Sequence, residues 1–178
     1  MMGHIIIDGP DAVGKTTLGE FIKDKFGFEI VHSGAENAND YEYHSSLLKD
    51  KNHKFYDRFM AGEFVYPRIY GRPAKLTVTE MDKLFDEIEE TNSLYIIVNT
   101  SNLDIVNERL IARGELDYLD EIKEQTQLFL AFASNIFEER FENKKPNFKY
   151  FDIAKPNAYD DLYRYVEEFI KSNMEGES

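Results

Sequence analysis

The sequence of 178 residues contains no cysteine, and its acidic residues far outnumber its basic ones. Without cysteine neither disulfides nor thiolate metal sites can form, and the four histidines are not spaced as a zinc cluster. The formal net charge of -13 argues against a general nucleic-acid-binding protein, because affinity for a phosphate backbone depends on many lysines and arginines. A small anion can still bind where positive charge is concentrated locally.

Long apolar runs are lacking as well. No stretch approaches the ~20 apolar residues of a membrane span, and the start MMGHIIIDGPD has no basic region before its short apolar run. We therefore expect a cytoplasmic protein with neither a membrane span nor a signal peptide. The sequence shows no internal repeat, low-complexity segment or linker, so residues 1–178 are predicted to form one domain that ends in a disordered acidic tail at about 174–178.

Short apolar runs alternate with helical patterns along the chain. Strands are predicted for runs rich in β-branched or aromatic residues, at 4–8, 28–33, 54–57, 94–100 and 148–154. Helices are predicted at about 16–26, 78–91, 104–113, 120–141 and 160–174. The polar segment 35–52 reads either as a mobile helix or as a loop. Because parallel strands need crossover connections, the pattern predicts an α/β fold with a five-stranded parallel sheet flanked by helices on both faces.

The segment GPDAVGKTT, residues 9–17, lies between the first predicted strand and a helical pattern. It matches G-x-x-x-x-G-K-[ST], in which glycines let successive backbone N–H groups face one anion. The lysine, Lys15, then reaches the outer phosphates, and the Thr16 hydroxyl ligates Mg²⁺. We predict a loop that binds ATP as co-substrate with Mg²⁺ as cofactor, rather than a plain strand–helix turn. The residues expected around the phosphates are Gly9, Pro10, Ala12, Val13, Gly14, Lys15, Thr16 and Thr17.

Two residues of this loop have more than one interpretation. Thr17 either contacts an inner phosphate or merely begins the helix. Asp11 places a carboxylate inside a cradle for anions, which is unfavourable unless it points away, toward a sugar hydroxyl or a metal-bound water. The alternative for Asp11 is an ordinary turn residue on the approach to the helix.

A second candidate region is KFYDRFMAGEFVYPRIYGRP, residues 54–73. Asp57 ends a predicted strand and Arg58 follows it, at the sheet edge where ligands of parallel sheets bind. A carboxylate there can hold the magnesium shell or accept a proton, and an adjacent guanidinium can bind a second phosphate bidentately. Tyr66 and Arg72 supply a flat face and charge of the kind that a nucleoside monophosphate needs. The alternative is a structural Asp–Arg ion pair.

Taken together, these residues resemble the thymidylate kinase-like (deoxy)nucleoside monophosphate kinases of the P-loop superfamily. The likeness rests on GPDAVGKTT, on Asp57-Arg58 followed by the spaced Tyr66 and Arg72, and on ERLIARGELDYLDE (108–121). The last segment is similar to the arginine-bearing lid of that family, here at about 109–120. The segment GEFVYPRIYGR is closer to phage-type or distant relatives of the family. The resemblance implies a P-loop kinase fold and transfer of the γ-phosphoryl of ATP to a deoxynucleoside monophosphate, with thymidylate favoured.

By this likeness Asp11 would hold the 3′-hydroxyl of the sugar, Arg58 the acceptor phosphate, and Arg72 the base or the phosphate. Tyr66 would lie against the deoxyribose and disfavour a 2′-hydroxyl. Asn157 would belong to the loop that holds adenine. The resemblance also implies a homodimer, and the expected partners are small-molecule nucleotides.

The chain departs from some members of the family at Ala12, where they carry an arginine directly after the P-loop aspartate. The charge of the transition state must then be met from elsewhere. Arg109 and Arg113, one helical turn apart in the lid, are the natural source; otherwise they are ordinary surface charges of a helix. The predicted catalytic residues are Lys15, Asp57, Arg58, Arg109 and Arg113, and the predicted metal-binding residues are Thr16 and Asp57.

Two rival functions are weighed against this one. A deoxynucleoside kinase shares the fold, but its pattern after the third strand usually reads Glu-Arg-Ser, where this chain has Asp57-Arg58-Phe59. A nucleotide-binding regulatory module would have less use for two arginine clusters beside a tyrosine-rich segment. The base of the acceptor stays open.

Overall fold

Five parallel strands form one sheet in the computed structural model of the protein, which describes residues 2–142 and 145–175. The strands are β1 (Ile5–Asp8), β2 (Glu29–His32), β3 (Lys54–Asp57), β4 (Leu94–Asn99) and β5 (Phe148–Asp152). Their order across the sheet is β2-β3-β1-β4-β5, and every neighbouring pair is parallel. The predicted sheet is confirmed, with strand ends within about two residues of those expected.

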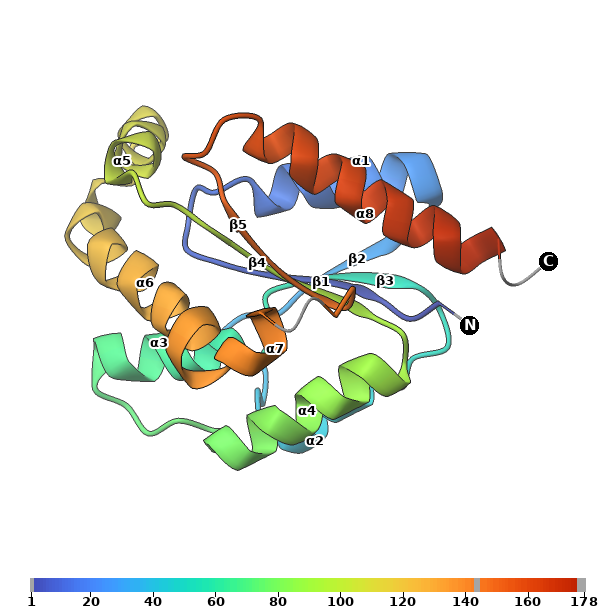
Figure 1. Ribbon diagram of the computed structural model, residues 1–178. Helices are drawn as coiled ribbons and strands as arrows, with labels where there is room; N and C mark the ends of the chain where they lie inside the picture. The colour runs from blue at the N-terminus through green and yellow to red at the C-terminus, as the bar shows by residue number, and fades with distance from the viewer. Residues whose placement is uncertain (1, 143–144, 176–178) are drawn as a thin grey trace.

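Helices cover both faces of this sheet (Figure 1). On one face lie α1 (Lys15–Phe26), α5 (Leu103–Ala112) and α8 (Ala158–Glu175), which share a core with Ile5, Ile7, Ile96 and Val98 of the central strands. On the other face lie α2 (Tyr41–Leu48), α3 (Ala61–Tyr70) and α4 (Val78–Glu90). Because both faces are covered, β1, β3 and β4 are buried throughout, as the absence of polar alternation in their sequences predicts.

The helix α6 (Leu119–Ala131) crosses the sheet edge at which the P-loop lies and joins both cores. It gives Ile122 to the core beneath α1 and α8, and Phe129 to the core beneath α3 and α4. The short 3₁₀ turn Leu116–Tyr118 precedes it. The predicted lid leads into α6 and so lies at the edge of the sheet where β1 and β3 end (Figure 1).

The single long helix predicted for residues 120–141 is wrong. The helix α6 ends at Ala131, a π-helical turn runs from Phe132 to Ile136, and α7 (Glu138–Glu142) follows. The extra residue of a π turn rotates the side chains after it. Phe132 and Phe137 thereby both contact Phe85, with ring centroids 6.1 and 4.7 Å away.

Three other segments bear on the predicted helices and the predicted tail. The polar stretch 35–52 contains the ordered helix α2, whose N-terminus is capped by the Asp40 side chain. The capping box at Thr77 and Glu80 is confirmed at the start of α4. At the C-terminus α8 continues to Glu175, so the tail does not begin at 174, and residues 176–178 lie outside the described part. Of the helices described, none combines the length and the apolar character that crossing a membrane requires.

Candidate phosphotransfer site

The loop between β1 and α1 has the backbone that its glycines were expected to permit. Gly9 and Gly14 adopt φ angles of +156° and +97°, and a Cβ at Gly9 would lie 2.0 Å from the Val98 carbonyl oxygen. No side chain in the described part of the chain caps the N-terminus of α1 at Gly14. The first N–H groups of α1 are thus available to an anion, as in other helix N-termini that bind phosphate.

Lys15 begins α1 and folds back across the loop. Its Nζ donates hydrogen bonds to the carbonyl oxygens of Gly9 (2.9 Å) and Pro10 (2.7 Å). Burial lowers the pKa of Lys15, while the nearby carboxylates of Asp57 and Asp11 act in the opposite direction. The ammonium group is therefore held by the loop itself, at the place where the phosphates of a nucleotide would lie.

Asp57, the last residue of β3, presents one carboxylate oxygen without a partner. Its Oδ2 lies 3.0 Å from Nδ1 of His32, the residue opposite it on β2. Its Oδ1 is buried and has no hydrogen-bond partner among the residues that the structure describes. A buried oxygen of this kind is expected to find a ligand, and Mg²⁺ prefers carboxylate and hydroxyl oxygens. With the exposed Thr16 at the start of α1, the donor set fits a magnesium ion that a nucleotide brings with it.

A first cavity of about 390 Å³ opens on the Asp11 side of the loop. All four residues predicted to bind the acceptor line it, namely Asp11, Arg58, Tyr66 and Arg72. Glu115 and Tyr118 of the predicted lid complete its wall. Four positions spread over sixty residues of sequence thus meet in one cavity.

Arg58 links the P-loop to this cavity. It adopts a φ of +76°, which is unusual for a residue with a side chain, and its Nη2 lies 3.2 Å from Oδ1 of Asp11. Its guanidinium lies 5.9 Å from the centroid of the Tyr66 ring. Among the ion pairs of the described residues, Arg58 therefore pairs with Asp11 and Asp57 with His32, in place of the Asp57–Arg58 pair that was the alternative. The Arg58–Asp11 pair borders the cavity, so it is compatible with the ligand-binding interpretation of Arg58.

Arg72 also lines this cavity, where it forms a bidentate pair with Glu63 of α3. Its Nη1 and Nη2 donate to the Glu63 carboxylate at 3.1 and 3.0 Å, and the backbone N–H of Lys75 donates to the same carboxylate. Burial works against the charged form of Glu63, but these bonds outweigh it and hold its pKa below the usual range. Glu63 thus holds Arg72 in place at the wall of the cavity.

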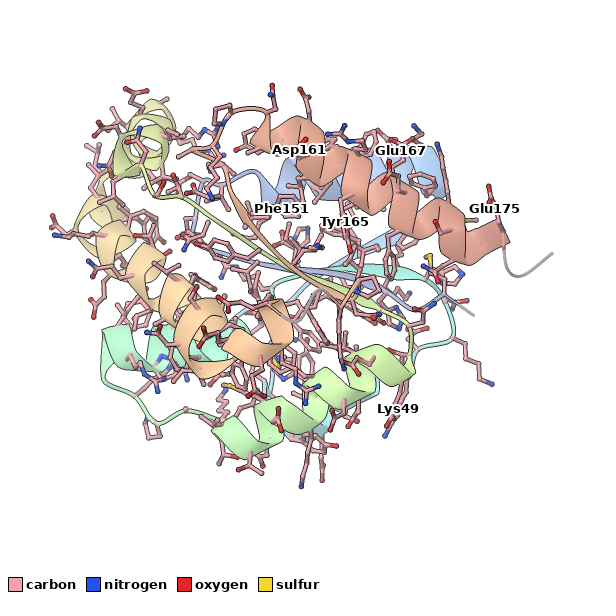
Figure 2. All side chains as sticks on the ribbon, viewed as in Figure 1. Lys49, Phe151, Asp161, Tyr165, Glu167 and Glu175 are labelled. Atoms are coloured by element: carbon pink, nitrogen blue, oxygen red, sulfur yellow. The ribbon has the colours of Figure 1, made fainter. Side chains whose placement is uncertain are left out.

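A second cavity, of about 750 Å³, lies on the other side of the loop. Gly14 and Thr17 of the loop line it, together with Arg109 and Arg113 of the predicted lid and with Tyr159. On α8 its wall extends to Glu167 (Figure 2). Glu167 forms ion pairs with Lys25 of α1 and with Lys171. The phosphate loop therefore runs between two cavities, with Asp11 facing one and Gly14 the other.

Arg109 and Tyr159 hold the outer side of the P-loop. Nη1 of Arg109 donates to the Ala12 carbonyl oxygen (2.8 Å) and to the Tyr159 hydroxyl (2.7 Å), which itself donates to the Val13 carbonyl oxygen (2.9 Å). Asn157, predicted for the adenine loop, lies just before α8 with a φ of +59°. Tyr159, two residues further on, contributes directly to the second cavity, and the sequence analysis missed it.

The solved structures that resemble this chain share the same fold. The YorR protein from Bacillus subtilis, solved in complex with phosphorylated GDP, matches with a TM-score of 0.74 at 19% identity, over 97% of this chain and 98% of that one. The deoxyadenosine kinase of M. mycoides matches with a TM-score of 0.57 at 16% identity, over 95% and 98%. A gluconokinase from Sinorhizobium meliloti matches with a TM-score of 0.55 at 14% identity, over 99% and 97%.

The chain thus has the fold of these solved structures, with a five-stranded parallel sheet at its centre. At such low identities the likeness extends to the fold and not to the substrate. A scan against protein-family models and a search of the curated proteins find no match for this chain.

Asp8 is a buried carboxylate beside the loop that the sequence analysis did not single out. It ends β1 directly before Gly9, is 1% exposed, and accepts hydrogen bonds from the backbone N–H groups of Phe59 (2.8 Å) and Ala61 (3.1 Å). The Tyr95 hydroxyl donates to it as well, at 2.6 Å. Asp8 thus fixes the segment that carries Arg58, across a separation of about fifty residues that no local pattern reveals.

We expect Asp8 to make stability depend on pH. Burial raises its pKa to about 6, against an ordinary value of 3.8. A raised pKa means that the fold favours the protonated form of Asp8. The contribution of Asp8 to the free energy of unfolding is therefore fully present below pH 3.8 and is lost as the pH rises through about 6. The Asp8→Asn variant cannot ionise at this position. As the pH rises from 4 to 8, the difference in unfolding free energy between the two proteins should therefore shift by up to about 3 kcal/mol in favour of the variant. Denaturant unfolding of both proteins across this range measures it, and parallel profiles would contradict it.

Proposed function

We propose that this protein is an ATP-dependent phosphotransferase that moves the γ-phosphoryl of ATP to a deoxynucleoside monophosphate, with a thymidylate-like acceptor favoured. The observation that carries the proposal is the pair of cavities on the two sides of one phosphate loop. A protein that only binds or hydrolyses a nucleotide needs one such cavity, whereas a kinase must place donor and acceptor on either side of the phosphoryl group in line.

In this proposal the donor phosphates lie on the N-terminus of α1. The loop amides and Lys15 hold the outer phosphates, while Thr16 and Asp57 would hold Mg²⁺, which spreads the negative charge of the phosphates when it is bound. Thr17 and Tyr159 border the cavity that takes the rest of the donor nucleotide. Little covalent chemistry is left for the protein, so its residues act mainly by positioning and by electrostatic stabilisation.

The acceptor is proposed to occupy the first cavity. Arg58 would bind the acceptor phosphate beside the P-loop, and Asp11 would accept a hydrogen bond from the 3′-hydroxyl of the sugar. Tyr66 would lie against the deoxyribose, and Arg72 would bind the base or the phosphate. All four side chains border the same cavity, which is the support that the structure gives to these roles.

Arg109 and Arg113 are proposed to stabilise the negative charge of the transition state, because Ala12 stands where some members of the family carry an arginine for this purpose. Arg109 already contacts the loop through the Ala12 carbonyl oxygen, and both arginines border the second cavity. Arg109 is therefore the better placed of the two to follow the phosphates when the segment 109–120 closes over them. Closure would also exclude water, so ATP hydrolysis without an acceptor should be slow.

A deoxynucleoside kinase is the second candidate, favoured by the similarity to the M. mycoides deoxyadenosine kinase over 95% of this chain. Both candidates use the same P-loop and differ in whether the acceptor already carries a phosphate. Arg58, at the loop end of the first cavity, supports the phosphorylated acceptor.

An acceptor panel tests the proposal. The protein is incubated with ATP, Mg²⁺ and a panel of deoxynucleosides and their monophosphates, and ADP formation and the new product are followed. We expect at least one monophosphate to be phosphorylated with a kcat/KM at least about 10-fold above that of its nucleoside, because a hydrogen-bonded charge contributes about 1.5–3 kcal/mol. A preference for nucleosides would support the second candidate, and absence of turnover with every acceptor would support a nucleotide-binding module without transfer activity.

A further inference from the structure

Gln125 is a wholly buried amide in the middle of α6. It is 0% exposed and lies between Ile122 and Phe129, which belong to the two apolar cores. Burying an amide is unfavourable unless its donors and acceptor are satisfied. The hydrogen-bond partners of its oxygen and nitrogen atoms therefore indicate the role of Gln125.

Both ends of the amide bind Asp11. Its Oε1 accepts a hydrogen bond from the Asp11 backbone N–H (3.2 Å), and its Nε2 lies 3.4 Å from Oδ2 of Asp11. The same Nε2 donates to Oε2 of Glu121 at 3.1 Å. An amide nitrogen has two hydrogens, so Gln125 serves one carboxylate with each.

These contacts hold the Asp11 carboxylate from two sides. Gln125 approaches Oδ2 from α6, and Arg58 approaches Oδ1 from the segment after β3. Glu121 in turn accepts a hydrogen bond from the Tyr70 hydroxyl of α3 (2.7 Å). Asp11, Arg58 and Tyr70 all line the first cavity, so the chain of bonds ends there.

The charge balance explains why a neutral amide suits this position. Asp11 belongs to a loop that binds anions, where a free carboxylate would be repelled by phosphates. A lysine at position 125 would neutralise the carboxylate, and a glutamate would add a third negative charge beside Asp11 and Glu121. Glutamine fixes the orientation of the Asp11 carboxylate and leaves its charge available as a hydrogen-bond acceptor toward the cavity.

We propose that Gln125 is a positioning residue that holds Asp11 toward the sugar hydroxyl of the acceptor, and so sets the preference for acceptors that carry a 3′-hydroxyl. The inference rests on the proposed function for the identity of the acceptor. It goes beyond that function by assigning discrimination at the 3′ position to a residue that does not itself border the cavity.

The test compares wild type with Gln125→Met, which keeps the length of the side chain and removes its hydrogen bonds. Each protein is assayed with a 2′-deoxynucleoside monophosphate that wild type accepts and with its 2′,3′-dideoxy analogue. For Gln125→Met we expect kcat/KM to fall about 10-fold with the deoxy acceptor and to stay within about 2-fold of wild type with the dideoxy acceptor. The KM for ATP should stay unchanged. Gln127→Met, at an exposed position of the same helix, is the matched control and should behave as wild type.

Two further measurements separate positioning from a general structural effect. In the Asp11→Asn background, Gln125→Met should cause no additional loss, because the residue acts through Asp11. Gln125→Asn, whose amide is one methylene too short to reach, replaces the methionine variant if the latter does not fold. Equal losses with both acceptors, or no loss with either, would overturn the inference while the proposed function stands. Absence of turnover by wild type on every acceptor would overturn both.

Discussion

Replacing Lys15 by methionine is expected to lower kcat/KM for phosphoryl transfer by about 10³-fold with any acceptor, as removal of a central transition-state charge does in comparable sites. Lys15 is the buried cation of the loop, and its Nζ is held by the carbonyl oxygens of Gly9 and Pro10. When phosphates occupy the loop, this ammonium group is the one placed to interact with them. Methionine keeps the length and the apolar stem, so the variant removes the charge with little change in packing.

Steady-state kinetics and nucleotide binding together check this prediction. Lys23→Met is the matched control, since Lys23 lies in the last turn of the same helix α1 and is exposed. The control should retain wild-type kinetics and stability. Because burial lowers the pKa of Lys15, its replacement should not reduce the unfolding free energy by more than about 1 kcal/mol. A Lys15→Met variant with near-normal turnover would show that the loop does not hold the transferred phosphoryl.

The parts of the site that follow one another in sequence could be predicted from it. The segment 9–17 carries its own conformational requirements, because positive φ at Gly9 and Gly14 and the strand before it are local properties. The sequence predicted Asp57 at the end of a strand and Arg58 directly after it, which the structure confirms, because the aromatic residues before them are typical of a short strand. Local patterns thus predicted the position of the loop and of the segment that follows β3.

Residues that act across the fold could not be predicted in the same way. Gln125 meets Asp11 across 114 positions, and Tyr159 meets Val13 across 146. His32 lies opposite Asp57 only because β2 and β3 pair in that register. A buried glutamine cannot be distinguished from a surface glutamine by its spacing in the sequence. Its hydrogen-bond partner in another element can be identified only from the structure.

The π turn at Phe132–Ile136 shows the same limit for secondary structure. The apolar residues from Phe129 to Phe141 have helical spacing, which predicts one continuous helix. Packing of several phenylalanines around Phe85 requires a rotation within that helix, and the inserted residue supplies it. Tertiary packing overrides the local period here, as it does wherever a core is crowded with aromatic rings.

Replacing Asp57 by asparagine is expected to lower kcat by about 10²–10⁴-fold, the range associated with loss of a positioned acid or base group. The two side chains have nearly the same shape, so the contact with His32 and the packing of β3 should persist. What changes is the charge at Oδ1, the buried oxygen that lacks a hydrogen-bond partner among the described residues. The matched control is Asp152→Asn, at the end of β5, where the carboxylate accepts hydrogen bonds from the backbone N–H groups of Ser101 and Ala154.

A titration with Mg²⁺ separates the two roles that Asp57 can have. If Asp57 holds the metal, the variant should need a higher Mg²⁺ concentration and recover part of its kcat when the metal is raised, because lost metal affinity is restored by mass action. If Asp57 accepts the proton of the acceptor, kcat should stay low at every Mg²⁺ concentration while the apparent affinity for the metal is unchanged. Asp152→Asn should follow wild type throughout the titration. Turnover by Asp57→Asn within about 3-fold of wild type at all metal concentrations would remove Asp57 from the reaction and leave its buried oxygen as a structural feature of the β2–β3 pair.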